Sequence, residues 1–385
     1  MNIKLKKEQR KPTIKSHVAY MRKAGIVLFL LVVSVALSAG AYYREEVPVG
    51  PYPLNYPANF GNRVNTPANE PVTRQAVYLG RMLFYETRLS ANNKLSCGSC
   101  HEQARAFTDG KALSAGVDNV LSTRNSMSLV NLLWARKFFW DGRAASLEDQ
   151  AIVPMTNPHE MGQSLTLSAQ KLSKTKNYPG IFKIVYGDTA ITSDRIVKVI
   201  AQFERTLISA HSRYDDYLRK AYQPTPLELQ GMTLFNQVPQ PEKGIRGANC
   251  THCHGGAKNY MELFHNNGLD SIYKDAGIEE LTGLAADRGR FKVPTLRNIA
   301  LTAPYMHDGR FKTLEEVIDH YSEHIKQSAS LSAFLQGESN ITSGTSLKLL
   351  PQEKKSLIAF LNMLTDTAFV TDPRFSNPHL TVNRK

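Results

Sequence analysis

The chain has 385 residues, which is long enough for two domains that each bury a core. Its apolar fraction of 42% and charged fraction of 21% are those of a globular protein and exclude an intrinsically disordered chain. Residues 1–23 carry eight Lys or Arg and one Glu, so they account for +7 of the net charge of +13. The remaining charge is modest, and we therefore expect no nucleic-acid partner.

Residues 24–43 are apolar and uncharged, and they follow this basic segment directly. A helix of about 20 such residues spans a bilayer, and the basic flank places its N-terminus in the cytoplasm. The small residues Ala39-Gly40-Ala41 are also typical of a signal-peptide cleavage site. We predict a transmembrane anchor in the inner membrane, with a cleaved signal peptide as the alternative. Either one places the rest of the chain in the periplasm.

Residues 44–71 are rich in Pro, Asn and Gly and predict a linker, either a tether or an extended wrap. Helical spacing and helix-start signals then recur along the chain. They predict helices from about Pro71, over 193–219, from Thr225-Pro226, from a capping box at 313–316 and over 351–364. Alternating strand patterns are scarce, so we expect a mostly α fold.

All four cysteines lie in two short motifs. These are Cys97-Gly98-Ser99-Cys100-His101 and Cys250-Thr251-His252-Cys253-His254. The C-x-x-C-H spacing is typical of covalent haem attachment, in which the thiols add to the haem vinyl groups and the histidine binds the iron. A zinc site or disulfides are the alternatives, but zinc needs four close ligands and the motifs lie in different halves. We predict two haem c groups with His101 and His254 as iron ligands.

The two halves also repeat each other. The segment 79–84 precedes the first motif as 230–235 precedes the second, and Arg-Asn occurs at 124–125 and again at 297–298. The clearest match pairs 140–149 with 307–316, and the same alignment pairs Pro154 with Tyr321. We predict two copies of one haem domain that face each other. The first iron would face a side chain that cannot bind it, and the second would face a phenol.

These residues resemble the bacterial di-haem cytochrome c peroxidase superfamily, which includes the MauG branch. The resemblance covers about residues 72–365 and rests on both haem motifs, on 139–143 and on 294–309. It implies two cytochrome c-like domains, 72–222 and 223–365, with a C-terminal tail at 366–385. It also implies a calcium ion between the domains, and many relatives form homodimers.

The resemblance assigns roles to individual residues. It makes the haem on Cys97, Cys100 and His101 the peroxidatic one, with Gln150, Pro154 and Glu160 in its distal pocket. Glu160 would move protons between the peroxide oxygens, whereas without the resemblance it would be a surface carboxylate. Trp140 would carry electrons between the haems, a role compatible with that of a buried core tryptophan. Asn125, Thr302 and Pro304 match the calcium ligands, and Arg124, Arg143, Arg297 and Arg310 are candidate partners of haem propionates.

Two positions depart from the usual peroxidase pattern. Val117 occupies the place of a distal histidine that binds the peroxidatic haem in many relatives. We therefore predict a first haem that is five-coordinate or water-bound without activation. Tyr321 stands where many peroxidases have methionine and the MauG branch has tyrosine. We favour Tyr321 as the second distal ligand, with Met306 as the alternative, and His307 occupies the repeat position of Trp140.

The predicted function is a peroxidase that reduces hydrogen peroxide to water. Electrons would enter through the second haem from a small c-type cytochrome or another donor. A MauG-like oxidation of a protein partner is the alternative. Maturation of tryptophylquinone is disfavoured. MauG enzymes that carry it out have a surface tryptophan two residues before the second haem motif, where this chain has Ala248. Apart from Trp140, the chain has only Trp134, which lies in the first half. A non-catalytic, membrane-tethered electron carrier is the third possibility.

Overall fold

The computed structural model of the chain describes residues 21, 46–67, 69–342 and 344–380. The predicted anchor or signal segment at 24–43 lies outside these residues, as does the basic segment 1–23 apart from Met21. The described part contains no helix that is long and apolar enough to cross a membrane.

A close helix crossing organises the first half. Helix α2 (Arg74–Phe84) crosses α7 (Ser193–Arg205) at Gly80. A Cβ at Gly80 would lie 1.8 Å from the backbone oxygen of Val199, so only glycine allows this approach. The Thr73 side chain accepts a hydrogen bond from the Ala76 amide and caps α2. The helix therefore begins three residues later than the predicted start at Pro71, which was wrong because Thr73 is the cap.

The second half contains the same crossing. Helix α9 (Pro226–Asn236) crosses α13 (Pro351–Met363) at Gly231, where a Cβ would lie 1.8 Å from the Ser356 oxygen. In both crossings a phenylalanine lies beside the glycine. The Cβ atom of Phe203 lies 3.0 Å from where a Cβ at Gly80 would be, and the Cβ atom of Phe360 lies 3.0 Å from where a Cβ at Gly231 would be. The duplication predicted from the sequence is therefore present in the packing.

The remaining elements are short and joined by long irregular segments. The first half adds α3 (Cys97–Cys100), α4 (Leu147–Thr156), α5 (Leu165–Ser173) and α6 (Tyr178–Tyr186), and α8 (Arg213–Leu218) follows α7. The second half adds α10 (Thr251–His254), α11 (Glu279–Thr282), α12 (Leu314–Glu323) and α14 (Thr367–Thr371). Eight 3₁₀ turns complete the described helices: η1 (Ala58–Phe60), η2 (Thr87–Leu89), η3 (Gln103–Arg105), η4 (Leu132–Trp134), η5 (Pro241–Lys243), η6 (Ala285–Asp287), η7 (Ile299–Leu301) and η8 (Ala333–Leu335).

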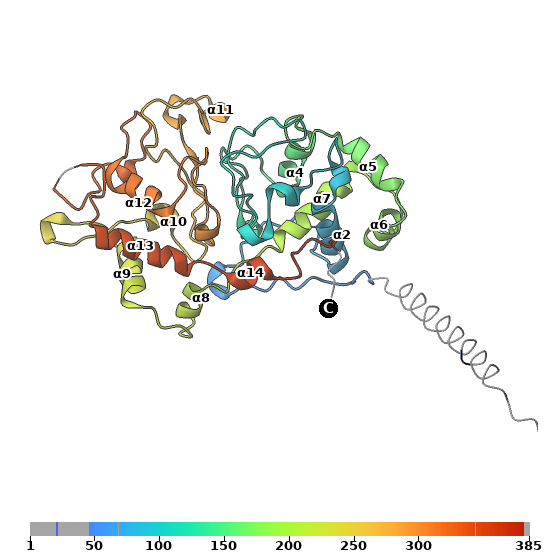
Figure 1. The fold of residues 1–385 in the computed structure, drawn as a ribbon, viewed down its shortest axis with the longest axis horizontal. Coiled ribbons are helices and arrows are strands. Elements are labelled where there is room, and N and C mark those ends of the chain that lie inside the picture. Colours follow the sequence, from blue (N-terminus) through green and yellow to red (C-terminus); the bar gives the residue numbers. More distant parts are fainter. Residues whose placement is uncertain (1–20, 22–45, 68, 343, 381–385) are drawn as a thin grey trace, which may run out of the picture. The chain divides into compact units, whose positions relative to one another are not determined.

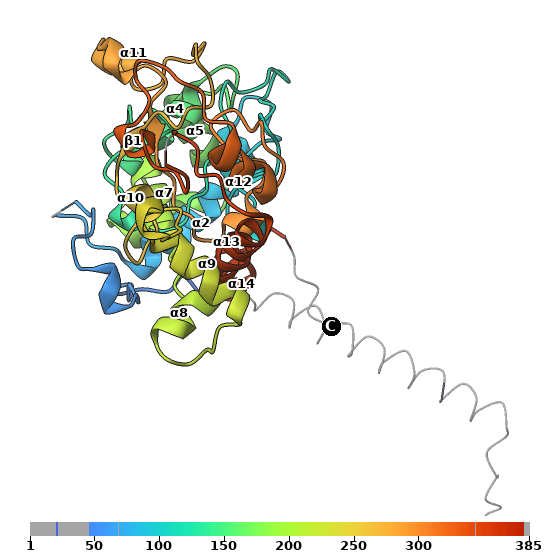
Figure 2. The same ribbon diagram turned by 90° about the vertical axis from the view of Figure 1, so that its left-hand side faces the viewer.

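A two-stranded antiparallel sheet is formed by β1 (Phe264–His265) and β2 (Phe291–Lys292), with Phe264 opposite Lys292. Figure 1 shows the two halves next to each other, with α2 and α7 in one and α9 and α13 in the other. Figure 2 shows the second half facing the viewer. The mostly helical fold predicted from the sequence is confirmed.

One predicted correspondence between the halves is wrong. Asn131 precedes η4 and Asn298 precedes η7, and both adopt a left-handed backbone. The backbone N–H of Asn131 donates to Leu207 O, and that of Asn298 donates to Leu364 O, each at 2.9 Å. Asn131 is thus the counterpart of Asn298, and the Arg-Asn pair at 124–125 is a coincidence of sequence.

The single helix predicted over 193–219 is also wrong. Helix α7 ends at Arg205, and the chain runs through an irregular segment before α8. There the Asp366 carboxylate accepts hydrogen bonds from Ser209 Oγ at 3.0 Å, Ala210 N at 3.0 Å and His211 N at 2.9 Å. These bonds replace the ones that a continuous helix would supply.

Both ends of the described chain pack onto its body. Near the N-terminus, Tyr56 and Phe60 pack against Trp134, with ring centroids 5.0 and 5.3 Å away. The linker is thus a wrap rather than a free tether. Near the C-terminus, Tyr85 Oη donates to Phe375 O at 2.7 Å. The segment predicted as a tail therefore returns, over its described residues, to the first half.

Candidate functional site

Both C-x-x-C-H motifs line one cavity of about 590 Å³. The first motif forms α3 and His101, and the second extends from Cys250 through α10. All four cysteines are free thiols, so no disulfide is formed within or between the two motifs of this structure. No group of three or more His, Cys, Asp or Glu that could hold a metal ion occurs in the described part of the chain. The arrangement therefore argues against a zinc site.

The two motif histidines are held in the orientation that an axial haem ligand needs. Nδ1 of His101 donates to Phe107 O at 2.8 Å, and Nδ1 of His254 donates to Pro294 O at 3.1 Å. Each ring therefore keeps Nε2 as a lone-pair donor. Burial lowers the pKa of His101 and lowers that of His254 to about 4, which favours the neutral form that binds iron.

The predicted distal residues of the first half line this cavity together. Gln150 and Pro154 lie on α4, and Glu160 lies in the turn that follows the helix. Glu160 Oε1 accepts a hydrogen bond from Asn157 Nδ2 at 2.7 Å. Asn157 therefore fixes the carboxylate of Glu160, and its own role was not predicted from the sequence.

Helix α12 is the counterpart of α4, and its cap resembles that of α4. Ser146 accepts from Asp149 N, and Thr313 accepts from Glu316 N. Pro154 and Tyr321 therefore occupy equivalent positions on the two helices, and both line the cavity. The asymmetry between the two motifs that was predicted from the sequence thus has a spatial basis.

The two candidate ligands of the second iron meet at one amide group. Asn267 Nδ2 lies 3.3 Å from Tyr321 Oη and 3.4 Å from Met306 Sδ. Burial raises the pKa of the Tyr321 phenol. Phenol oxygen and thioether sulfur can both bind haem iron. The geometry brings both alternatives into the site, and sequence reasoning missed Asn267.

The loop before Arg124 brings Val120 and Leu121 to the cavity, whereas Val117 does not line it. The Val117 amide donates to Glu160 O at 2.8 Å. Its side chain lies against Gly162, where a Cβ would come within 2.9 Å of Val117 Cγ2. Beside this loop, His159 Nδ1 pairs with Asp118 Oδ2 at 2.7 Å. That pair, also missed from the sequence, joins the loop to the segment that carries Glu160.

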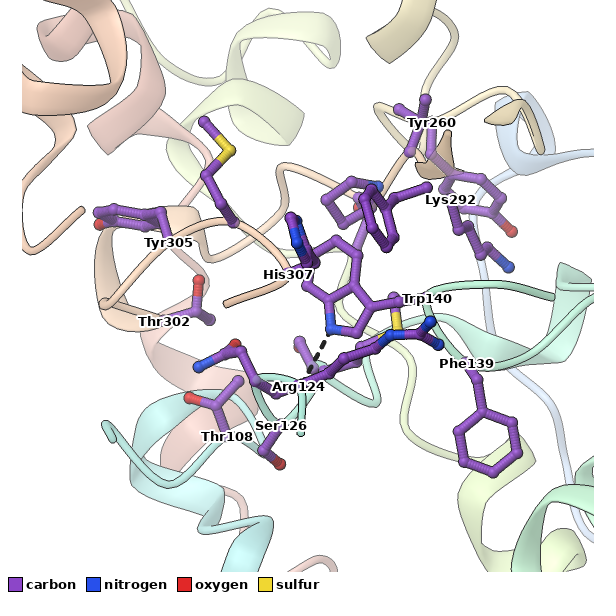
Figure 3. Close-up of a pocket in the computed structure, with 18 of the residues that line it drawn as sticks. Thr108, Arg124, Ser126, Phe139, Trp140, Tyr260, Lys292, Thr302, Tyr305 and His307 are labelled. Atoms are coloured by element: carbon purple, nitrogen blue, oxygen red, sulfur yellow. Dashed lines mark hydrogen bonds between the residues drawn. The ribbon is translucent and has the colours of Figure 1, made fainter. Parts of the chain in front are cut away.

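Trp140 lines the cavity, and its backbone oxygen accepts a hydrogen bond from Lys292 N of the second half at 2.7 Å. Its indole N–H donates to Asn125 O at 2.9 Å, the hydrogen bond marked by the dashed line in Figure 3. The Asn125 amide donates in turn to His307 O at 2.7 Å. His307 stacks on Phe291 with ring centroids 3.8 Å apart. A continuous set of contacts therefore leads from Trp140 to the second half.

The three predicted calcium ligands Asn125, Thr302 and Pro304 also line the cavity. Asn125 Nδ2 donates to Lys111 O at 2.8 Å, which leaves its amide oxygen for another partner. Thr302 Oγ1 donates to Ile299 O at 3.2 Å. These oxygens are of the type that a hard cation prefers.

The four arginines proposed as propionate partners are all paired with carboxylates. Arg124 bonds Asp275 of the second half at 2.7 Å, Arg143 bonds Asp141 at 2.8 Å, Arg297 bonds Asp215 at 2.7 and 2.8 Å, and Arg310 bonds Asp270 at 2.6 Å. Arg310 does not line the cavity, whereas the other three do. Arg124, Arg297 and Arg310 therefore join segments that are distant in sequence, whereas Arg143 pairs within its own turn.

Two buried donors in the second half instead face the cavity without a partner. Tyr260 Oη and His265 Nε2 are buried and form no hydrogen bond in the described part of the protein. The Ser332 hydroxyl lies 3.1 Å from His265 Nδ1, and when it donates to that nitrogen the ring proton is on Nε2. Unpaired buried donors are costly. A haem that brings its carboxylates to this wall would satisfy both, so the residues present fit the group.

Comparison with known proteins agrees with this site. A family described as di-haem cytochrome c peroxidase matches residues 74–223. Methylamine utilization protein MauG of Methylophilus methylotrophus is 31% identical, over 88% of this chain and 93% of its own length. Cytochrome c551 peroxidase of Nitrosomonas europaea is 35% identical, over 72% of this chain and 84% of its own length.

Solved structures give the same result. A MauG-like protein associated with microbial copper homeostasis has a TM-score of 0.75 and 34% identity, covering 85% of this chain and 99% of that chain. The diheme peroxidase BthA from Burkholderia thailandensis has a TM-score of 0.65 at 22% identity, over 77% of this chain and 87% of its own, and bears on the fold alone. The chain belongs to the di-haem cytochrome c peroxidase family, which includes both peroxidases and MauG proteins.

Proposed function

We propose that the protein reduces hydrogen peroxide to water at the first haem site, with electrons supplied through the second. The observation that carries this proposal is the carboxylate of Glu160, which Asn157 holds at the wall of the cavity. Pro154, which cannot bind iron, lines the same cavity at the position equivalent to Tyr321. An open iron position and a fixed proton carrier are what peroxide cleavage needs.

The protein residues would divide the work as follows. Each bound haem supplies a redox-active iron. Glu160 takes a proton from the near peroxide oxygen and delivers it to the far one, so that the departing oxygen leaves as water. Two electrons and two protons convert one peroxide into two waters. Phe107 O holds the His101 ring so that its Nε2 remains available to the iron.

The second site would receive the electrons. Tyr321 is the proposed distal ligand there, with Met306 as the alternative, and Trp140 is the proposed conduit between the sites. The donor is proposed to be a small c-type cytochrome, and a calcium ion is proposed at Asn125, Thr302 and Pro304. The periplasm is the proposed location, because covalent haem attachment and the N-terminal sequence both favour export.

A MauG-like oxidation of a protein partner is the second candidate. The observation that favours it is Tyr321, whose half-buried phenol lies on α12 in the position that matches Pro154. A phenolate ligand stabilises oxidised iron and would help the site hold oxidising equivalents.

The test is steady-state oxidation of a reduced c-type cytochrome by the full-chain holoprotein with peroxide. We expect E160Q to lower turnover by roughly 100- to 10,000-fold with both haem spectra unchanged. The matched control is E70Q, which removes a surface carboxylate that pairs with Lys198, and it should keep wild-type turnover. Wild-type protein that consumes no donor while peroxide oxidises its haems would point instead to the MauG-like reaction.

A further inference from the structure

One carboxyl group in the cavity has an oxygen without a hydrogen-bond partner among the described residues. Glu204, near the end of α7, is 4% exposed and lines the cavity. Its Oε2 atom is buried and forms no hydrogen bond among the described residues. Cys97 of the first haem motif lines the same cavity as Glu204, and burial raises the pKa of its thiol. An unpaired buried polar group destabilises the folded protein. Packing alone would therefore favour an apolar side chain here.

The second half has that apolar side chain. Phe203 and Phe360 lie at the same place in the two glycine crossings, so the residues that follow them, Glu204 and Leu361, are equivalent. Leu361 is 6% exposed and lines the same cavity. The first haem site thus has a carboxyl where the second has a hydrocarbon branch.

The neighbouring charges leave Glu204 uncompensated. Arg205, on the same helix, directs its guanidinium to Glu148 on α4, with bonds of 2.8 and 2.9 Å, and to Asn65 O at 3.1 Å. Burial raises the pKa of Glu204 to about 8, the field of Arg205 lowers it and that of Glu148 raises it. Cys97 on α3 is the other titratable neighbour, and haem attachment removes its thiol proton. Burial therefore favours the protonated, neutral form of the Glu204 carboxyl.

We propose that Glu204 is the proton-releasing partner of the first haem, tied to the oxidation state of that haem. Removal of one electron from the haem adds a positive charge to a poorly solvated cavity. The O–H bond of the Glu204 carboxyl then breaks, the proton leaves to solvent, and the carboxylate compensates the new charge. When the electron returns, the carboxyl takes up a proton again. The electron acceptor is a redox mediator in the experiment below and peroxide under the proposed function.

This coupling is reciprocal, so pH must act on the potential of the haem as the haem acts on the proton. Oxidation lowers the proton affinity of Glu204, and the first haem's reduction potential therefore falls as the pH rises through the pKa of the carboxyl. The limit is about 59 mV for each tenfold change in proton concentration in a one-electron, one-proton couple. The second haem has no such group at Leu361. The inference requires the first haem but not peroxide turnover, so its failure is separate from a failure of the proposed function.

The experiment is a spectroelectrochemical titration of both haems in the full-chain holoprotein, without peroxide, on both sides of about pH 8. We expect the first potential to fall by up to about 59 mV per pH unit. E204Q and E204L should lose this slope, and the latter places the side chain of Leu361 in the equivalent position. E70Q is the matched surface control and should keep the slope. A first-haem potential that is independent of pH in the wild type, or a slope that persists in E204Q, would overturn the proposal.

A second measurement covers the case in which the variants fail to assemble. The redox-difference infrared spectrum of wild-type holoprotein should lose a protonated-carboxyl band when the first haem is oxidised. Labelling the protein with carboxyl-¹³C glutamate should shift that band. A band that is absent, or one that does not shift because it arises from the haem propionates, would overturn the assignment to Glu204.

Discussion

The side-chain nitrogen of Asn267 lies 3.3 Å from the phenolic oxygen of Tyr321. The same nitrogen lies 3.4 Å from Met306 Sδ, so the two atoms that could bind the second iron share one donor. Hydrogen bonds to charged acceptors are stronger than those to neutral ones. Asn267 would therefore stabilise a phenolate more than a thioether, which favours Tyr321 as the ligand.

Replacing Tyr321 with Phe tests this choice. We expect Y321F to change the ferric spectrum of the second haem and to raise its reduction potential, because a phenolate stabilises oxidised iron. M306L is the matched control and should leave both properties unchanged. A spectrum that responds to M306L and not to Y321F would identify the methionine as the ligand.

Trp140 can be tested as the conduit with Trp134 as its matched control. Trp140 lines the cavity and donates to Asn125 O, whereas Trp134 donates to Gly61 O beneath the N-terminal wrap. W140F should slow electron transfer between the haems by at least tenfold, because the indole supports charge transfer better than a phenyl ring. W134F should leave this rate unchanged. Flash-photolysis or stopped-flow kinetics would measure it, and equal rates in W140F and wild type would exclude Trp140 as the conduit.

Arg297 and Asp215 form a bidentate ion pair whose side chains are 0% and 2% exposed. D215N leaves the guanidinium buried without a counter-charge, which should lower the free energy of unfolding by about 3–5 kcal/mol. The double variant D215L/R297M removes both charges and should lose much less. Urea unfolding followed by circular dichroism measures both, and an equal loss in the two proteins would show that the charge pairing is not what matters.

The same pair predicts part of the acid sensitivity. Burial on its own would raise the pKa of Asp215, but the bonds from Arg297 and Ser212 outweigh it and lower the pKa. A carboxyl with a lowered folded-state pKa stabilises the protein above its unfolded pKa of about 4, and this stabilisation is lost as the pH falls through the folded-state value. Wild-type stability should therefore fall more steeply below about pH 4 than that of D215N. Identical pH profiles would contradict this assignment.

Gly80 tests the helix crossing that supports the first haem domain. Its Cβ position lies 1.8 Å from a carbonyl oxygen, so G80A must separate α2 from α7 and should cost at least about 1–3 kcal/mol. G231A should have the same effect on α9 and α13. Gly180 on α6 is the control, since no atom lies within 4 Å of its Cβ position. Thermal unfolding of G180A should show no loss, and a loss equal to that of G80A would rule out the crossing as the cause.

The parts of the site that could be predicted from sequence are those in which spacing itself determines the chemistry. The C-x-x-C-H motifs fall in α3 and α10, and the repeat alignment correctly placed Pro154 and Tyr321 on equivalent helices. The helix starts at Thr225 and Thr313 were predictable, since each side chain caps its own helix within three residues.

The parts that could not be predicted depend on partners distant in sequence. The break after α7 is stabilised by Asp366, which follows α13 and has no local signal near residue 206. Asn267 acquires its place only when α12 brings Tyr321 beside it. Glu204 fits the helical pattern of α7, and its isolation becomes evident only when Arg205 is seen to pair with Glu148. The pairs Arg124–Asp275 and Arg297–Asp215 likewise join segments that no local pattern connects.

The most direct test of the central claim, that the two haem sites differ in what faces each iron, is the ferric electronic and EPR spectrum of the full-chain holoprotein before and after addition of peroxide. The site geometry predicts one high-spin haem that responds at once to peroxide, without prior reduction, and one low-spin haem that keeps its distal ligand. Two low-spin haems that do not react with peroxide would contradict it.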